Sequence, residues 1–210
     1  MALSAAAPND AALFATPVRR VMVDGADALN REIEAAALSF ASDDALGRRW
    51  SADHGYPGYT SYGSIPDLVS RASCFAALKK TLDREAAAFA QALAFDLGGV
   101  RLKLDNIWLN VMPKGGFHSG HIHPHSVLSG TYYARTPTGA AAIRFEDPRL
   151  PMMMAAPPRR EDAPDALRSF VYMSPEEGTA LFWESWLRHE VVRNESSRPR
   201  ISVSFNYRWG

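Results

Sequence analysis

The hydrophobic pattern of this sequence changes period at Gly98-Gly99, and this change constrains the fold more than any other feature. Before the two glycines, apolar residues recur every three or four positions over 26–45 and 75–93, which predicts amphipathic helices. A short edge strand is expected over 13–23, where Pro17 lacks an amide donor for a central position. After the glycines, apolar runs between turn residues predict strands over 104–112, 127–135, 141–145, 169–173, 179–183, 188–192 and 200–207.

Helices gathered before a run of strands predict a mainly β (α+β) fold. The expected architecture is a double-stranded β-helix, a jelly-roll or cupin-like barrel, with N-terminal helices packed on one outer face. The length favours a single domain over 1–210, with an N-terminal strand and helices in 1–99 and the barrel core in 100–210. Residues 47–64 are expected to form a long loop, and Ser64-Ile65-Pro66-Asp67 is typical of a helix start.

Charge and composition exclude several kinds of partner. Lys plus Arg and Asp plus Glu are equal at 23 each, so no overall field attracts nucleic acid, and none is expected as a partner. No stretch of eighteen apolar residues predicts a membrane span, and Met1–Asp10 lacks the basic and apolar regions of a signal peptide. The single cysteine, Cys74, excludes an intramolecular disulfide. These features predict a cytoplasmic protein.

Four of the six histidines fall between His118 and His125. On a strand, residues i and i+2 point to the same side, so His121 and His123 can present two imidazoles to one ion. The isolated His189, far downstream, is the expected third ligand. Three protein ligands leave coordination positions open, which is typical of a catalytic rather than a structural site. His118 and His125 remain alternative ligands, and a histidine cluster without metal is the remaining alternative.

The last predicted strand carries one polar face. Polar side chains at even positions from Arg200 through Ser202 to Asn206 alternate with apolar side chains at odd positions. An arginine inside a barrel needs a carboxylate partner, which a dicarboxylate ligand supplies. Asn110 on strand 104–112 and Tyr133, which points opposite to Tyr132, are further candidates for the interior.

Residues 148–168 are rich in proline, methionine and charge. A loop of this length inside a compact domain is often functional, and its methionines make it a candidate for an adaptable lid over a site.

Several motifs together carry a resemblance to a known family. They are His121-Ile122-His123-Pro124, Leu128-Ser-Gly-Thr-Tyr-Tyr133, Ser185-Trp-Leu-Arg-His189 and Arg200-Ile-Ser202. With these motifs the sequence resembles the non-haem iron, 2-oxoglutarate-dependent oxygenases, and specifically a bacterial and phage family of 2-oxoglutarate/iron(II) oxygenases. The resemblance implies a double-stranded β-helix that uses Fe(2+), 2-oxoglutarate and O2. The implied dioxygenase couples oxidative decarboxylation of 2-oxoglutarate to hydroxylation of a small-molecule or peptide substrate.

The resemblance also implies residue roles. His121 and His189 match the first and last metal ligands, Arg200 matches the arginine that pairs with the far carboxylate of 2-oxoglutarate, and Ser202 would assist it. From their places on the strands, Asn110 and Tyr133 are second-tier candidates for contact with the cosubstrate, and a core amide is the alternative for Asn110. The sequence departs from the family at the middle ligand, where most members carry aspartate or glutamate and this chain carries His123.

Two alternative functions share the expected barrel. Gly115, five intervening residues and His121-x-His123 resemble the first cupin motif, and cupin-type three-histidine iron dioxygenases bind their substrate without 2-oxoglutarate. Arg200-x-Ser202 argues against that alternative, because such an enzyme needs no dicarboxylate anchor. The other alternative is a non-enzymatic barrel that binds a metal or small ligand. Homodimerisation through a helix or an edge strand is common for such barrels and is a further expectation.

Overall fold

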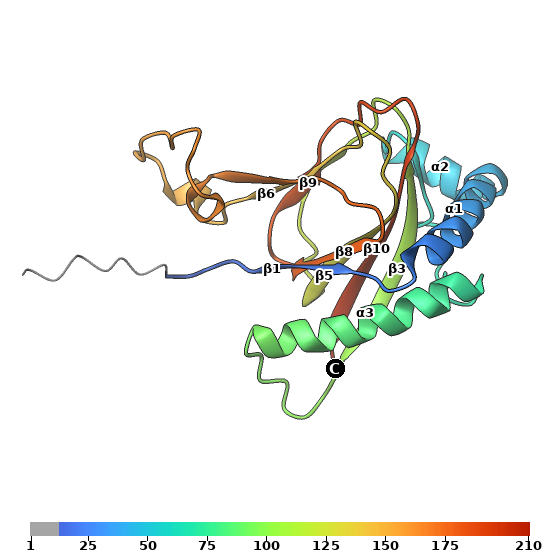
Figure 1. The fold of residues 1–210 in the computed structure, drawn as a ribbon, viewed down its shortest axis with the longest axis horizontal. Helices are drawn as coiled ribbons and strands as arrows, with labels where there is room; N and C mark the ends of the chain where they lie inside the picture. The colour runs from blue at the N-terminus through green and yellow to red at the C-terminus, as the bar shows by residue number, and fades with distance from the viewer. Residues whose placement is uncertain (1–12) are drawn as a thin grey trace, which may run out of the picture.

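The computed structural model describes residues 13–210 and contains two antiparallel sheets with the helices on one side (Figure 1). Met1–Asp10, on which the prediction of no signal peptide rests, lies outside the described residues. No helix in the described part of the chain has the length and apolar character to cross a bilayer. The helices are α1 (Ala26–Asp43), α2 (Ala45–Asp53) and α3 (Ser73–Ala92).

Within residues 13–210, ten strands form two antiparallel sheets, which agrees with the predicted double-stranded β-helix. The larger sheet has the order β1-β8-β5-β10-β3-β2, and the smaller has the order β4-β9-β6-β7. The strands are β1 (Val18–Met22), β2 (Tyr59–Thr60), β3 (Leu102–Met112), β4 (His118–His121), β5 (Leu128–Arg135), β6 (Ile143–Glu146), β7 (Phe170–Met173), β8 (Thr179–Glu184), β9 (His189–Val191) and β10 (Arg200–Trp209).

The main hydrophobic core lies between the larger sheet and the helices. The odd-numbered residues of β10, such as Val203 and Phe205, are fully buried there with Ile33 of α1 and Leu78 of α3. Burying each such side chain contributes about 1.5–3 kcal/mol, so this layer holds the helices on the outer face. Arg200, Ser202 and Ser204 of β10 consequently face the barrel interior, where Arg200 begins the strand. The prediction of helices on one outer face is correct (Figure 1).

Strand β10 is central, because it pairs with β3 along its whole length and with β5 on its other side. Gly130 of β5 lies opposite Phe205, and a Cβ atom at this position would lie 2.2 Å from Phe205 Cζ. The glycine of the Leu-Ser-Gly-x-Tyr-Tyr motif is therefore required for packing of the aromatic ring.

Two local predictions between 44 and 72 are wrong. Helix α2 occupies part of the expected loop, because Asp44 caps it by accepting the Gly47 amide proton at 2.9 Å. The expected helix after Ser64 is replaced by turns, because the Ser64 hydroxyl donates to Asp44 rather than capping its own segment. Tyr59 donates to the same carboxylate at 2.9 Å. Asp44 thus joins three segments that sequence periodicity treats separately.

The segment 148–168, expected as a lid, forms an arm that extends from the ends of β6 and β7 away from the helices (Figure 1). It contains two short 3-10 turns, Leu150–Met152 and Asp165–Leu167. Several of its residues line a cavity together with Leu13–Thr16, and none lines the two cavities next to the predicted metal ligands. The arm therefore does not cover the predicted site in this structure.

Candidate metal centre

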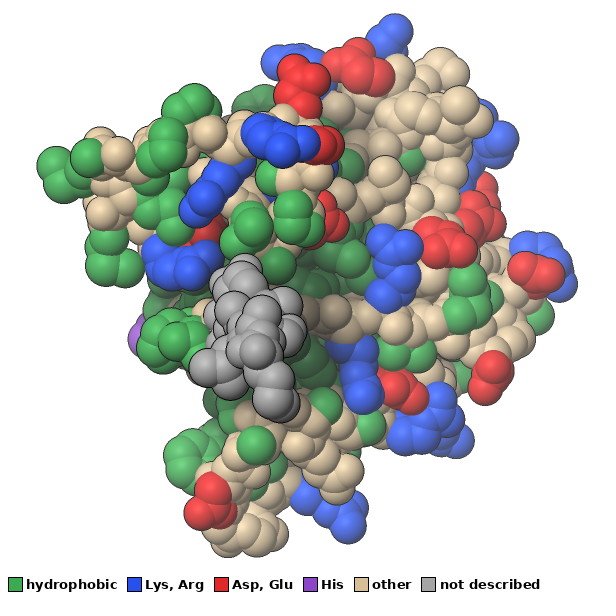
Figure 2. Space-filling view, turned by 60° about the vertical axis from the view of Figure 1, so that its left-hand side comes forward, with side chains coloured by type: hydrophobic (Ala, Val, Ile, Leu, Met, Phe, Trp, Pro, Cys, Tyr) green, Lys and Arg blue, Asp and Glu red, His purple; other side chains and the backbone are tan. Residues whose placement is uncertain are grey.

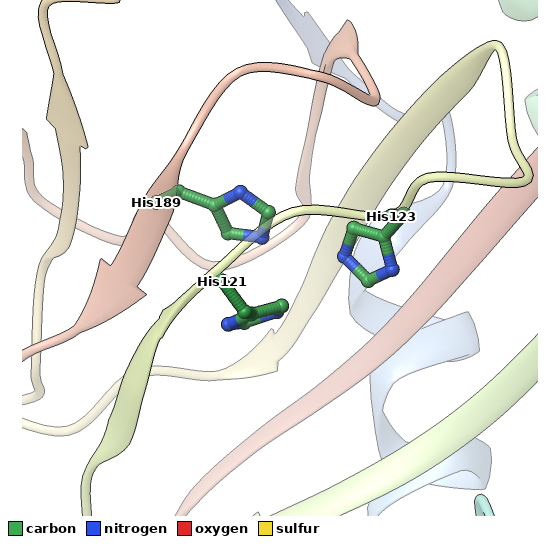
Figure 3. Close-up of side chains that lie close together, drawn as sticks. All are labelled: His121, His123 and His189. Carbon is green, nitrogen blue, oxygen red and sulfur yellow. The ribbon is translucent and has the colours of Figure 1, made fainter.

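The three predicted metal ligands lie together inside the barrel (Figure 3). His121 ends β4 and pairs directly with His189 of β9, and their ring centroids are 4.4 Å apart. One nitrogen from each of His121, His123 and His189 lies within 4.8 Å of the others. The two sheet-borne histidines come from neighbouring strands, so the backbone pairing itself sets their spacing.

His123 reaches the cluster by a different route from the one predicted. It follows the end of β4, so it does not share a strand with His121, and the i to i+2 argument fails at this residue. Its amide donates to the Ser185 carbonyl at 3.0 Å, which fixes the turn that brings its ring toward His189. A loop contact, rather than strand alternation, therefore places the third imidazole.

Backbone carbonyls orient two of the imidazoles. His121 Nδ1 lies 2.7 Å from the Ser119 carbonyl, and His189 Nδ1 lies 2.9 Å from the Leu187 carbonyl. Each Nδ1 therefore donates its proton to a carbonyl, and Nε2 keeps a free lone pair. This arrangement is the usual way in which a protein fixes the tautomer of a metal-binding histidine.

Side chains, rather than the backbone, surround the outer nitrogen of His123. Its Nδ1 lies 3.4 Å from the side-chain amide of Asn206. That amide is held by the Ser129 hydroxyl, which donates to Asn206 Oδ1 at 2.8 Å, and by Asn106, whose Oδ1 accepts a hydrogen bond at 2.8 Å. The even-numbered face of β10 thus also orients the histidine that departs from the family pattern.

Burial keeps these histidines neutral. The pKa of His123 is lowered to about 4, first by burial and next by electrostatic repulsion from His121 when that ring is protonated. Burial is likewise the main cause that holds the pKa of His121 below, and that of His189 well below, the ordinary value. Neutral imidazole is the form that binds metal ions, so the cluster is ready to bind an ion at neutral pH.

The alternative ligands His118 and His125 lie differently. His118 packs against the ring of His121 at 4.1 Å between centroids, and burial lowers its pKa to about 3, but it is not a member of the cluster. His125 is exposed. His118 is therefore a neighbour of the cluster, and neither His118 nor His125 is a member of it.

Arg200 lines the same narrow chamber as the three histidines. Its side chain is 2% exposed, its Nη1 donates to Ser202 Oγ at 3.3 Å, and its guanidinium lies 4.9 Å from the centre of the Tyr133 ring. Within residues 13–210, Arg200 Nε has no hydrogen-bond partner, and no Asp or Glu lines the chamber. A permanently charged group is thus buried without an anion beside it.

The remaining predicted residues divide into two groups. Asn110 lines the chamber and donates to Ser204 Oγ at 3.0 Å, whereas Tyr133 lies beneath Arg200 without lining the chamber. Sequence reasoning missed Tyr56, whose hydroxyl donates to Asn110 Oδ1 at 3.4 Å and whose pKa is raised to about 12 by burial. Its only signal was the concentration of aromatic residues in the expected loop 47–64.

The donor set fits a transition-metal ion, iron among others, and a dicarboxylate. Three imidazoles suit iron, copper, nickel and zinc, and their single-sided arrangement leaves other coordination positions to a ligand. The unpaired guanidinium of Arg200 fits the far carboxylate of 2-oxoglutarate, because an arginine fork binds a carboxylate through two hydrogen bonds.

Comparison with known proteins gives a match to one protein family. Residues 106–206, which contain all three histidines and Arg200, match the family described as "Putative 2OG-Fe(II) oxygenase". This part of the chain is thus similar to the 2OG-Fe(II) oxygenases, a family of oxidoreductases that use Fe(2+), 2-oxoglutarate and O2. A search of curated proteins found no match to the sequence.

Solved structures that are similar to this one are distant in sequence. The epimerase SnoN, in complex with Fe3+, alpha ketoglutarate and nogalamycin RO, is 16% identical with a TM-score of 0.64 over 92% of this chain and 79% of SnoN. A Pseudomonas putida prolyl-4-hydroxylase is 16% identical with a TM-score of 0.55 over 92% and 93% of the two chains. The protein spans 59% of a Burkholderia pseudomallei 2OG-Fe(II) oxygenase family oxidoreductase, covering 65% of its own length at 15% identity and a TM-score of 0.46.

Proposed function

We propose that the protein is an Fe(II)- and 2-oxoglutarate-dependent hydroxylase in which His121, His123 and His189 hold the metal. The observation that carries this proposal is the buried, unpaired Arg200 in the chamber that the three histidines line. Bound iron would supply the oxidising chemistry, which couples decarboxylation of 2-oxoglutarate to oxidation of the substrate.

The residues of the chain have binding and positioning roles in this proposal. Arg200 pairs with the far carboxylate of 2-oxoglutarate, Ser202 supports the guanidinium, and Asn110 offers its amide to the cosubstrate. The chamber has a volume of only about 40 Å³, so its side chains must move apart to admit the five-carbon dianion. A cosubstrate bound there leaves little room for water, which protects a reactive centre from side reactions.

Charge balance supports the use of a dianionic cosubstrate. Three neutral imidazoles and Arg200 provide no negative charge, so an Fe(2+) ion in this chamber would lie in a region with an excess of positive charge. A dianion compensates more of that charge here than in a site that already contains an aspartate or glutamate ligand. Binding of iron and binding of 2-oxoglutarate should therefore strengthen each other.

An anaerobic titration of the iron(II)-loaded protein with 2-oxoglutarate tests the proposal. Chelation of iron(II) by a 2-oxo acid gives a weak visible charge-transfer band, which we expect in the wild-type protein and not in His121→Ala. In Arg200→Ala the band should require much more 2-oxoglutarate while iron binding is retained. Stoichiometric iron without any band would instead favour the cupin-type dioxygenase that binds its substrate directly, and no iron uptake would favour the binding barrel.

The proposal extends to location and partners. A cytoplasmic enzyme is supported by the single buried Cys74, because unpaired cysteines suit a reducing compartment. The substrate is a small molecule or peptide rather than nucleic acid or membrane, and homodimerisation remains part of the proposal. Size-exclusion chromatography with light scattering tests the oligomeric state.

A further inference from the structure

A second cavity of about 380 Å³ opens beside the metal centre, and we name it the aromatic cleft. His121 and His123 line it together with Trp50, Tyr62, Trp108 and other ring-bearing side chains, and a few smaller residues such as Thr60 and Ser119 complete the lining. Cavities of this size accommodate small-molecule ligands. Because His121 and His123 of the metal-binding cluster line both the cleft and the chamber, a molecule bound in the cleft lies next to the metal centre.

A continuous series of aromatic contacts runs from helix α2 to the metal-binding histidine His123. The ring centroids of Trp50 and Tyr62 are 5.7 Å apart, those of Tyr62 and Trp108 are 5.1 Å apart, and those of Trp108 and His123 are 6.2 Å apart. Aromatic rings bind other rings by stacking or edge contacts at these distances. The cleft therefore offers ring faces and edges along the path to the metal ligands.

The outer end of this series is held in place by its neighbours. The ring of Trp50 stacks on His54 at 4.0 Å between centroids. On another side lies Gly63, where an added Cβ atom would come within 2.2 Å of the Trp50 ring. Tyr62 next to it is 53% exposed, so a large aromatic side chain remains open to a ligand at the mouth of the cleft.

The cleft differs from the rest of the protein in charge. Asp, Glu, Lys and Arg make up 22% of the sequence, yet none of them lines the cleft among the residues that the structure describes. Its polar groups are hydroxyls, the Asn110 amide and imidazoles. A charged ligand would lose water there without gaining an ion-pair partner, which is costly, whereas a neutral ligand would not.

We infer that the substrate of this enzyme is an uncharged small molecule with a flat ring system, which packs against the rings that line the aromatic cleft. The inference rests on the proposed function, because the cleft is a substrate site only if the adjacent centre carries out the reaction. Ring faces select flatness, the absence of charged side chains selects neutrality, and the volume selects a free small molecule over a polymer. A hydroxyl or carbonyl on the ring system would find partners in Asn110 and the cleft hydroxyls.

Calorimetric titration of the iron(II)- and 2-oxoglutarate-loaded protein, without oxygen, tests the inference with matched probes. The probes are 2-naphthol, its anionic counterpart 2-naphthoate, the cation 2-naphthylmethylammonium, and decahydro-2-naphthol, which is neutral but not flat. We expect 2-naphthol to bind most tightly. A capped, uncharged tripeptide of glycine and proline serves as the peptide probe and should bind more weakly.

Two exposed tyrosines provide a matched pair of variants. Tyr62→Ala should weaken 2-naphthol binding by roughly three- to tenfold, the usual worth of one aromatic contact. Tyr172 on β7, 57% exposed and outside the cleft, serves as the control, and Tyr172→Ala should leave binding unchanged. Retention of the charge-transfer band in both variants shows that they are folded and loaded.

The outcomes separate the inference from the proposed function. A charge-transfer band together with equal or tighter binding of a charged probe, the saturated probe or the peptide overturns the inference and leaves the oxygenase proposal intact. Equal binding by wild type and Tyr62→Ala also overturns it. Absence of the band overturns the proposed function, and with it the assignment of the cleft as a substrate site.

Discussion

Replacing Arg200 by methionine should make the protein more stable in the absence of 2-oxoglutarate. The guanidinium is buried, lies in a chamber without carboxylates, and leaves Nε without a partner among the described residues. Methionine keeps much of the length and all of the apolar stem without the charge. Arg200→Met therefore removes an uncompensated buried charge at little cost in packing.

The magnitude follows from the unsatisfied group. A buried polar group without a partner costs about 1–3 kcal/mol, and 1 kcal/mol shifts the Tm of a domain of this size by roughly 2–4 °C. Arg200→Met should thus raise Tm by several degrees. In the iron-loaded wild-type protein, 2-oxoglutarate at a hundred times the Kd of 2-oxoglutarate should add about 2.7 kcal/mol to the free energy of unfolding. The variant should gain far less.

Thermal unfolding in a buffer free of carboxylates and phosphate, with and without 2-oxoglutarate, measures both effects. Arg135→Met is the matched control, because Arg135 Nη1 lies 2.6 Å from Glu34 Oε1 and its ion pair should make the same substitution destabilising. If Arg200→Met lowers the Tm of the protein without 2-oxoglutarate as Arg135→Met does, Arg200 is a structural residue and the reasoning is refuted.

Three further changes test other parts of the structure. His189→Ala should abolish stoichiometric iron(II) binding, measured by metal analysis after dialysis, whereas the exposed His125→Ala should bind iron normally. Gly130→Ala should destabilise the fold by about 1–3 kcal/mol in urea unfolding, because its Cβ atom would overlap Phe205, and an unchanged midpoint would contradict the packing argument. Burial opposes ionisation of Asp44, but hydrogen bonds from Ser64, the Gly47 amide and Tyr59 prevail, so its pKa in the folded protein lies below the ordinary value. Its ionised form therefore stabilises the fold above the unfolded-chain pKa of about 3.9, and this contribution is lost as pH falls through the lower folded-state pKa. Asp44→Asn should lower the free energy of unfolding at pH 7 and make it depend less on pH in the acid range. Equal slopes of stability against pH in the variant and the wild-type protein would contradict this.

The sequence predicts the barrel and the side chains of its inner face because both depend on local periodicity. Alternation along β10 directs Arg200 and Ser202 inward and Phe205 toward the helices, and the structure has this arrangement. The pairing of His121 with His189 brings two predicted ligands together. Helices α1 and α3 and most strands beyond Gly99 likewise match their predicted ranges.

The features that the sequence did not predict depend on contacts between segments far apart in the chain. Helix α2 and the turns after Ser64 are organised by Asp44, which accepts hydrogen bonds from both neighbouring segments. The position of His123 depends on the Ser185 carbonyl, and that of Tyr56 depends on Asn110. The aromatic cleft is built from such segments, so periodicity gave no indication of it.

The pairing of His121 with His189 has a mechanical consequence for the smaller sheet. β4 is short and lies at the edge of that sheet, where only β9 holds it. An ion bound by both histidines would link β4 to β9. Without iron this link would be lost, and separation of β4 from β9 would expose backbone groups that can pair with another chain.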